Sequence, residues 1–212
     1  MRKNGYFYHV PRTGGFSTYK WFEKLSKMGH TRLWNDGHSP YKNKEQLVKK
    51  FGGRAKKLDK IELKPEDLIT ITWLRDPVAH SVSTYTYIKS HGGEKKFRGF
   101  KNGMTFSEWI RQKASPGSYV KFFAPGDGKL ETAIRNMETI DFIGFTENFN
   151  NDMNRLTKTF GVHNLKYNNL KINSSTGSFK PSKADVEFLR ERRKDDYLLV
   201  NEFRKRRGLP PY

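Results

Sequence analysis

Residues 11–18, Pro-Arg-Thr-Gly-Gly-Phe-Ser-Thr, combine a cation, hydroxyl groups and two glycines in a pattern that suits phosphate binding. The residues expected to surround the anion are Arg12, Thr13, Gly14, Gly15, Phe16, Ser17 and Thr18. The glycines let the backbone approach a phosphate closely, and amides at the start of a helix point toward it. The Walker A pattern of P-loop proteins is absent, because no lysine follows the second glycine at its spacing. The segment predicts a phosphate-binding turn of another kind.

A second segment, residues 71–85, carries an arginine and a serine at a spacing that also suits an anion. Arg75 follows an apolar run, and Ser83 comes eight residues later on the helix expected after Pro77. A guanidinium can bind two phosphate oxygens at once, and a serine hydroxyl can donate from the second turn of a helix. Asp76 is expected to cap this helix rather than to take part in chemistry.

Together the two segments resemble the sulfotransferases that use 3′-phosphoadenosine 5′-phosphosulfate (PAPS), the glycan sulfotransferases in particular. The first resembles their 5′-phosphosulfate loop, His-hydrophobic-Pro-Lys-Thr-Gly-Gly-Thr-Ser, and departs from it at Arg12 and Phe16. The lysine of that loop neutralises the leaving 5′-phosphate, so the resemblance implies this role for Arg12. The second segment resembles their 3′-phosphate element, an Arg-Asp-Pro turn followed by a serine. The resemblance implies that Arg75 and Ser83 bind the 3′-phosphate.

His38, in the sequence Gly-His-Ser-Pro, is the candidate general base. Sulfuryl transfer requires the acceptor hydroxyl to lose a proton, and a histidine suits that task near neutral pH. Several glycan sulfotransferases carry a histidine in a similar context, while other branches use a glutamate, which makes Glu45 the reserve candidate. The resemblance also implies that Ser174 and Lys180 contact the nucleotide. It implies a reaction without a metal, and no group of histidines and acids in the sequence indicates a metal site.

The elements that position these residues follow from hydrophobic periodicity. Strands are predicted at 5–10, 31–34, 68–74, 141–145 and 165–167; helices are predicted from about 17 to 28 and at 43–51, 77–85, 105–113, 129–138, 149–160 and 182–206. Ser17 or Thr18 is expected to cap the first helix. Strands that alternate with helices predict an α/β fold with a mainly parallel sheet, whose ligand lies beyond the carboxyl ends of the strands. The resemblance implies a three-layer sandwich like that of the P-loop nucleotide kinases. We expect one domain over residues 1–212, with a flexible basic loop at 92–104.

The composition limits the possible partners. Lysine and arginine total 41 against 22 acidic residues, so the net charge is +19 and attracts anions. Basic clusters at 95–101 and 204–207 could hold an anionic acceptor such as a sulfated or uronic-acid glycan. The resemblance favours a saccharide hydroxyl, and the hydroxyls of tyrosine, lipids and small alcohols are the alternatives. The chain has no cysteine, which excludes disulfides and cysteine catalysis. Because neither a signal peptide nor a membrane-spanning apolar run is visible, we expect a cytoplasmic enzyme of bacterial or viral origin.

Two other functions fit parts of the sequence. A small-molecule kinase would use the same kind of fold with ATP–Mg²⁺, but the Walker lysine spacing is missing. A nucleic-acid-binding protein would use the positive charge and interleaved aromatic residues such as Phe97, Phe100, Phe122 and Phe123. We expect these aromatic residues in the core instead, and no known nucleic-acid-binding signature is present.

Overall fold

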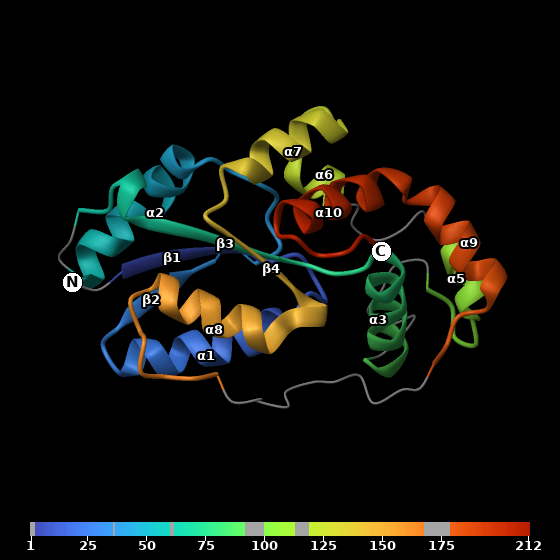
Figure 1. Ribbon diagram of the computed structural model, residues 1–212, viewed down its shortest axis with the longest axis horizontal. Helices are drawn as coiled ribbons and strands as arrows, with labels where there is room; N and C mark the ends of the chain where they lie inside the picture. The colour runs from blue at the N-terminus through green and yellow to red at the C-terminus, as the bar shows by residue number, and fades with distance from the viewer. Residues whose placement is uncertain (1–2, 36, 60–61, 92–99, 113–118, 168–178) are drawn as a thin grey trace.

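Four parallel strands form the central sheet of the protein (Figure 1). The computed structural model describes residues 3–35, 37–59, 62–91, 100–112, 119–167 and 179–212. The sheet has the order β2-β1-β3-β4, with β1 at Lys3–Tyr8, β2 at Thr31–Trp34, β3 at Leu68–Leu74 and β4 at Phe142–Phe145. Phe7 of β1 pairs with Ile71 of β3, which pairs in turn with Phe142 of β4. The predicted α/β class with a parallel sheet is confirmed.

Helices cover both faces of this sheet and make it the middle of three layers (Figure 1). Successive side chains of a strand face opposite sides, so Tyr6 and Tyr8 enter one cluster of buried apolar residues and Phe7 enters another. The helices that pack on the side of Phe7 are α1 at Gly15–Lys27 and α8 at Phe149–Thr159. Those on the side of Tyr6 are α2 at Lys44–Asp59, α6 at Tyr119–Phe123, α7 at Leu130–Glu138 and α10 at Lys194–Arg206.

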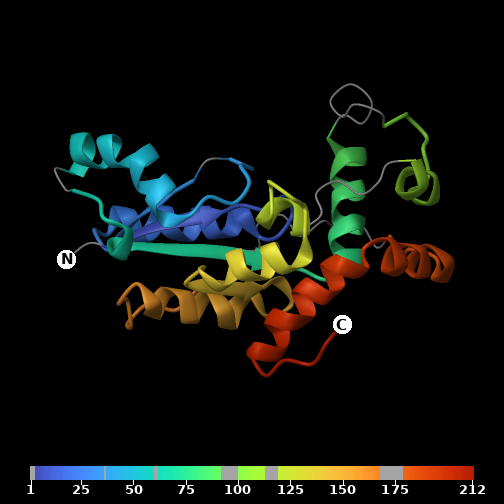
Figure 2. The same cartoon turned by 90° about the horizontal axis from the view of Figure 1, so that it is seen from above.

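Three further helices gather beyond one end of the sheet, as both views show (Figures 1 and 2). They are α3 at Pro77–Ser90, α5 at Phe106–Gln112 and α9 at Lys183–Arg192. Tyr85, Trp109 and Leu189 lie in their shared apolar cluster. Phe100 and Met104, at the end of the basic loop expected at 92–104, are buried in the same cluster, and residues 92–99 lie outside the described residues.

Helix α3 begins where the sequence predicts and continues past Tyr85 to Ser90. Its start is fixed by two residues, because Pro77 suits a first helical position and Asp76 Oδ1 accepts a hydrogen bond from the amide of Ala79 at 2.6 Å. The preceding strand is the run Leu-Ile-Thr-Ile-Thr-Trp-Leu, whose β-branched residues favour a strand covered on both faces. The end of β3 and the start of α3 together position Arg75 and Ser83.

Two predictions about the later chain are wrong. Residues 165–167 belong to no strand, and the ring of Tyr167 instead packs edge-on against Trp21 and Phe149. The helix predicted at 182–206 is two helices, α9 and α10, which meet at Arg193. No helix in the described part of the chain is long and apolar enough to cross a membrane.

Candidate functional site

The turn between β1 and α1 carries the first candidate segment, at the carboxyl end of β1. Its backbone enters the left-handed region at Arg12, with φ 65°, and at Gly14, with φ 86°. Gly14 caps α1, so the prediction of a cap at Ser17 or Thr18 is wrong and both residues lie inside the helix. The first amides of a helix have no partner within it, and the helix dipole adds positive potential there. These amides can bind an anion.

Gly15 leaves the space that the ring of His9 occupies. A Cβ at position 15 would lie 1.9 Å from Nε2 of His9, so only glycine fits while the ring stays there. Burial lowers the pKa of His9 to about 4, and the charges of His38 and Arg12 add to this effect. The His9 ring is therefore neutral at pH 7, and it contributes packing to the site rather than charge.

Two of the three hydroxyl groups in the turn hold its own backbone. Thr13 is fully buried, and its Oγ1 donates to the carbonyl of Val10 at 2.7 Å. Thr18 Oγ1 donates to the carbonyl of Gly14 at 3.0 Å. Ser17 lies in the first turn of α1 and is buried, whereas Phe16 beside it is 49% exposed. The threonine side chains thus fix the turn, whose backbone amides remain its donors for an anion.

The second segment meets the first at Arg12. Arg75 Nη1 donates to the carbonyl of Arg12 at 3.3 Å, and Arg12 Nε donates to Ser83 Oγ at 3.4 Å. No acidic side chain among the described residues lies within ion-pair distance of either arginine. Burial lowers the pKa of Arg12, and the charge of Arg75 acts in the same direction. Two half-buried cations side by side form a site that favours an anion.

His38 lies beside the turn as well. Its Nδ1 is 3.2 Å from the carbonyl oxygen of His9, and the centroids of the two imidazole rings are 4.6 Å apart. A carbonyl only accepts, so Nδ1 of His38 carries the proton and Nε2 keeps its lone pair when the ring is neutral. His38 is exposed, so Nε2 can take a proton from a bound hydroxyl. Glu45, the reserve candidate, lies exposed in the first turn of α2.

A buried polar network that the sequence did not reveal lies behind both segments. His80 Nε2 donates to the carbonyl of Pro11 at 2.8 Å, while its Nδ1 accepts from Arg193 at 3.3 Å. Arg193 also donates to Ser81 Oγ at 3.0 Å and forms an ion pair with Asp196 at 2.8 Å. Burial lowers the pKa of His80 to about 3, and the charge of Arg193 reinforces the shift. The network fixes the backbone of the first segment from the side of α3 and α10.

A second set of connected hydrogen bonds supports the turn after β3. Glu147 Oε1 accepts from the amide of Asp76 at 3.2 Å, and the hydroxyl of Tyr212 donates to the other oxygen of Glu147. Tyr212 is held in place by its amide, which donates to Asn201, and by the guanidinium of Arg204, 3.8 Å from the centre of its ring. Glu147, in the short 3₁₀ helix η2 at Thr146–Asn148, therefore positions the Asp76 turn.

The structure shows no contact between the described residue Lys180 and the residues above. Lys180 is exposed just ahead of α9, next to Phe179, whose ring packs against Tyr85 and Phe106 of the third apolar cluster. Ser174 lies outside the described residues. Over the residues that the structure describes, no three histidine, aspartate or glutamate side chains gather in a way that could hold a metal ion.

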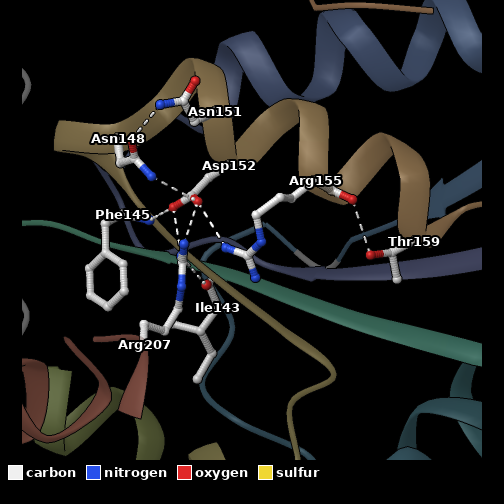
Figure 3. A network of polar contacts seen from close by, with 8 residues as sticks. All are labelled: Ile143, Phe145, Asn148, Asn151, Asp152, Arg155, Thr159 and Arg207. Atoms are coloured by element: carbon white, nitrogen blue, oxygen red, sulfur yellow. Dashed lines mark hydrogen bonds and ion pairs between the residues drawn. The ribbon is translucent and has the colours of Figure 1, made fainter. Parts of the chain in front are cut away.

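Most of the basic run at 204–207 is engaged within the protein. Arg207 donates from Nη1 and Nη2 to the two carboxylate oxygens of Asp152, at 2.9 and 2.8 Å (Figure 3). Asp152 is fully buried and also accepts from Arg155 and from the amide of Phe145. Arg206 pairs with Glu138 and Glu202. These arginines hold α10 to the rest of the fold, which leaves little of the run for an acceptor.

The chain has no close match among characterised families. No family model matches it, and a search of curated proteins finds no significant match. Its function is therefore argued from the site.

Proposed function

We propose that this protein is a PAPS-dependent sulfotransferase, which transfers a sulfuryl group from PAPS to an acceptor hydroxyl. The observation that carries the proposal is the meeting of Arg12, Arg75 and Ser83 beside the N-terminus of α1, without a carboxylate among the described residues to neutralise the arginines. This arrangement suits a ligand with two separate anionic groups. It lies at the carboxyl ends of β1 and β3, where parallel sheets bind their ligands.

In the proposed complex, the backbone amides of residues 14–17 bind the 5′-phosphosulfate, and Arg75 and Ser83 bind the 3′-phosphate. Ser174 and Lys180 remain proposed contacts of the nucleotide. The three-layer fold would then serve the nucleotide in the manner of the P-loop nucleotide kinases. Such preorganised donors stabilise charge as it develops on the leaving group, often the largest single contribution to catalysis.

The reaction we propose is an in-line displacement at sulfur. The acceptor oxygen attacks the sulfur of PAPS, a new S–O bond forms, and the bond between sulfur and the bridging oxygen of the 5′-phosphate breaks. The proton of the acceptor hydroxyl passes to Nε2 of His38, whose Nδ1 is held by the carbonyl of His9. The electron pair of the broken bond stays on the 5′-phosphate, beside the α1 amides. An anionic saccharide is the proposed acceptor, because the resemblance of the first segment to the glycan sulfotransferases favours a saccharide hydroxyl and the strong positive charge of the chain favours an anion.

The aromatic residues named for the nucleic-acid alternative weaken it. Phe100 and Phe123 are buried in apolar clusters, and Phe122 is partly buried against one of them. A side chain that stacks on nucleic acid bases has to be accessible. Phe97 lies outside the described residues.

Thermal unfolding with 3′-phosphoadenosine 5′-phosphate (PAP), ATP–Mg²⁺ or 5′-AMP tests the proposal. PAP at about 100 times its dissociation constant should add roughly 2.7 kcal/mol to the free energy of unfolding. We expect the largest increase in unfolding temperature with PAP. A larger increase with ATP–Mg²⁺ would indicate a kinase instead of a sulfotransferase. No increase with any of the three nucleotides would favour the nucleic-acid-binding function.

A further inference from the structure

The side chain of Arg12 leaves its own turn and lies along α3. Its Nε is 3.4 Å from Ser83 Oγ, and the centre of its guanidinium is 4.4 Å from the centroid of the Tyr87 ring. Ser83 and Tyr87 are four residues apart, so they lie on the same face of the helix. Among the described residues, the two side chains that contact the Arg12 guanidinium, Ser83 and Tyr87, thus both belong to α3. Neither of these contacts involves an amide of α1.

The backbone of the turn favours this direction. Arg12 adopts a left-handed conformation that costs free energy for any residue other than glycine, so its surroundings must impose it. Arg75 donates to the carbonyl of Arg12, and His80 donates to the carbonyl of the preceding Pro11. These two partly buried hydrogen bonds hold the peptide groups around Arg12 in place, so the turn itself directs the Arg12 side chain toward α3.

We infer that Arg12 binds the 3′-phosphate of the nucleotide together with Arg75 and Ser83, and that it thereby selects nucleotides that carry a 3′-phosphate. The inference rests on the proposed function, and it moves Arg12 from the leaving 5′-phosphate to the other end of the donor. The α1 amides and dipole are left to bind the 5′-phosphosulfate without it.

Arginine suits this role better than lysine. Its planar guanidinium can stack on the Tyr87 ring with one face while its N–H groups donate in the plane to Ser83 and to a phosphate oxygen. A lysine would keep the charge but lose the planar stack and the fork. Tyr87 is therefore a positioning residue, because it orients the guanidinium of Arg12.

Titration calorimetry with PAP and 5′-AMP tests the inference, because these nucleotides differ only in the 3′-phosphate. We expect Arg12→Lys to weaken PAP binding at least about tenfold, as for a lost charge-assisted hydrogen bond, and to change 5′-AMP binding less than about twofold. Arg192→Lys is the matched control, since Arg192 also lies over an aromatic ring, that of Phe188, but on the exposed side of α9. It should leave both affinities unchanged.

Each other outcome overturns a specific statement. Equal weakening of PAP and 5′-AMP by Arg12→Lys would return Arg12 to the 5′-phosphate, and unchanged PAP binding would remove it from the site. Wild-type protein that binds neither nucleotide would overturn the proposed function itself.

Tyr87→Leu and Tyr87→Phe keep the test valid should Arg12→Lys impair folding. Tyr87→Leu, which removes the ring, should weaken the binding of PAP more than that of 5′-AMP. Tyr87→Phe, which keeps the ring, should preserve most of the PAP affinity. A Tyr87→Leu variant with the PAP affinity of the wild type would contradict the positioning role.

Discussion

His9 and His38 adjoin one another, yet burial gives them different chemistry. His9 is packed against Gly15, and burial lowers its pKa to about 4. His38 is exposed and touches His9 through its backbone carbonyl. Burial disfavours the protonated form of His9, so His9 is poorly suited to accept a proton near pH 7. Of the two, His38 is therefore the one suited to proton transfer.

We expect His38→Ala to reduce sulfuryl transfer by about 10² to 10⁴-fold, as for loss of a general base, while PAP binding persists. Initial rates with PAPS and an anionic saccharide, measured beside the PAP thermal shift, separate the two effects. His163→Ala, at an exposed position after α8, is the control. Normal turnover in His38→Ala would leave Glu45 as the candidate base.

The sequence predicted which residues meet in the candidate site better than it predicted what each side chain does. Arg12, Arg75, Ser83 and His38 were named from local patterns, and the structure brings them to one end of the sheet. The hydroxyl of Thr13, by contrast, binds the carbonyl of Val10. Which acceptor a hydroxyl binds depends on the groups that lie near it in the folded protein. Sequence spacing alone could therefore not show whether the Thr13 hydroxyl binds a ligand or the protein backbone.

At the scale of elements, the strands that carry the site were predictable because their residues decide their structure locally. Residues 68–74 have strong strand propensity, and Asp76 and Pro77 are strong helix-start signals. The division of the predicted helix into α9 and α10 at Arg193 could not be predicted from the local sequence, because the contacts that cause it are made with residues distant in sequence. The Arg193 side chain points inward and contacts Pro77, Ser81 and His80. The polar sequence around Arg193 by itself predicts one continuous helix.

The carboxylate of Asp152 joins α8 to the end of α10, and its loss should be costly. Asp152→Asn would leave the guanidinium of Arg207 facing a neutral side chain in a buried position. We expect a loss of about 3 kcal/mol in the free energy of unfolding, typical of removing one partner of a buried pair. Urea denaturation measures it, with Asp195→Asn, an exposed acid at the start of α10, as the control. Equal effects of the two substitutions would refute a structural role for Asp152.

At the scale of the whole molecule, His80 couples stability to pH. Its pKa is about 3 in the folded protein, compared with an ordinary value of 6.5. The unfolded chain therefore binds more protons than the folded one between these values, and the free energy of unfolding falls as the pH drops below about 6.5. The slope from one such group is at most about 1.4 kcal/mol per pH unit. His9 acts in the same direction.

Urea denaturation at several pH values between about 5 and 8 should therefore show stability that is level above about 6.5 and declines below it. His80→Gln, which cannot gain a proton, should flatten this decline even if it lowers stability overall. An unchanged slope in His80→Gln would assign the pH dependence to other groups, His9 first among them.

The contact between Tyr212 and Glu147 connects the segment after α10 to the turn after β3. Glu147 also accepts a hydrogen bond from the amide of Asp76. Two successive hydrogen bonds through Glu147 therefore connect Tyr212 to the turn that carries Arg75. Tyr212→Phe, which removes only the hydroxyl, would loosen that turn from outside the proposed site. If the proposed function holds, this distant substitution would weaken PAP binding although Tyr212 touches none of the proposed nucleotide contacts.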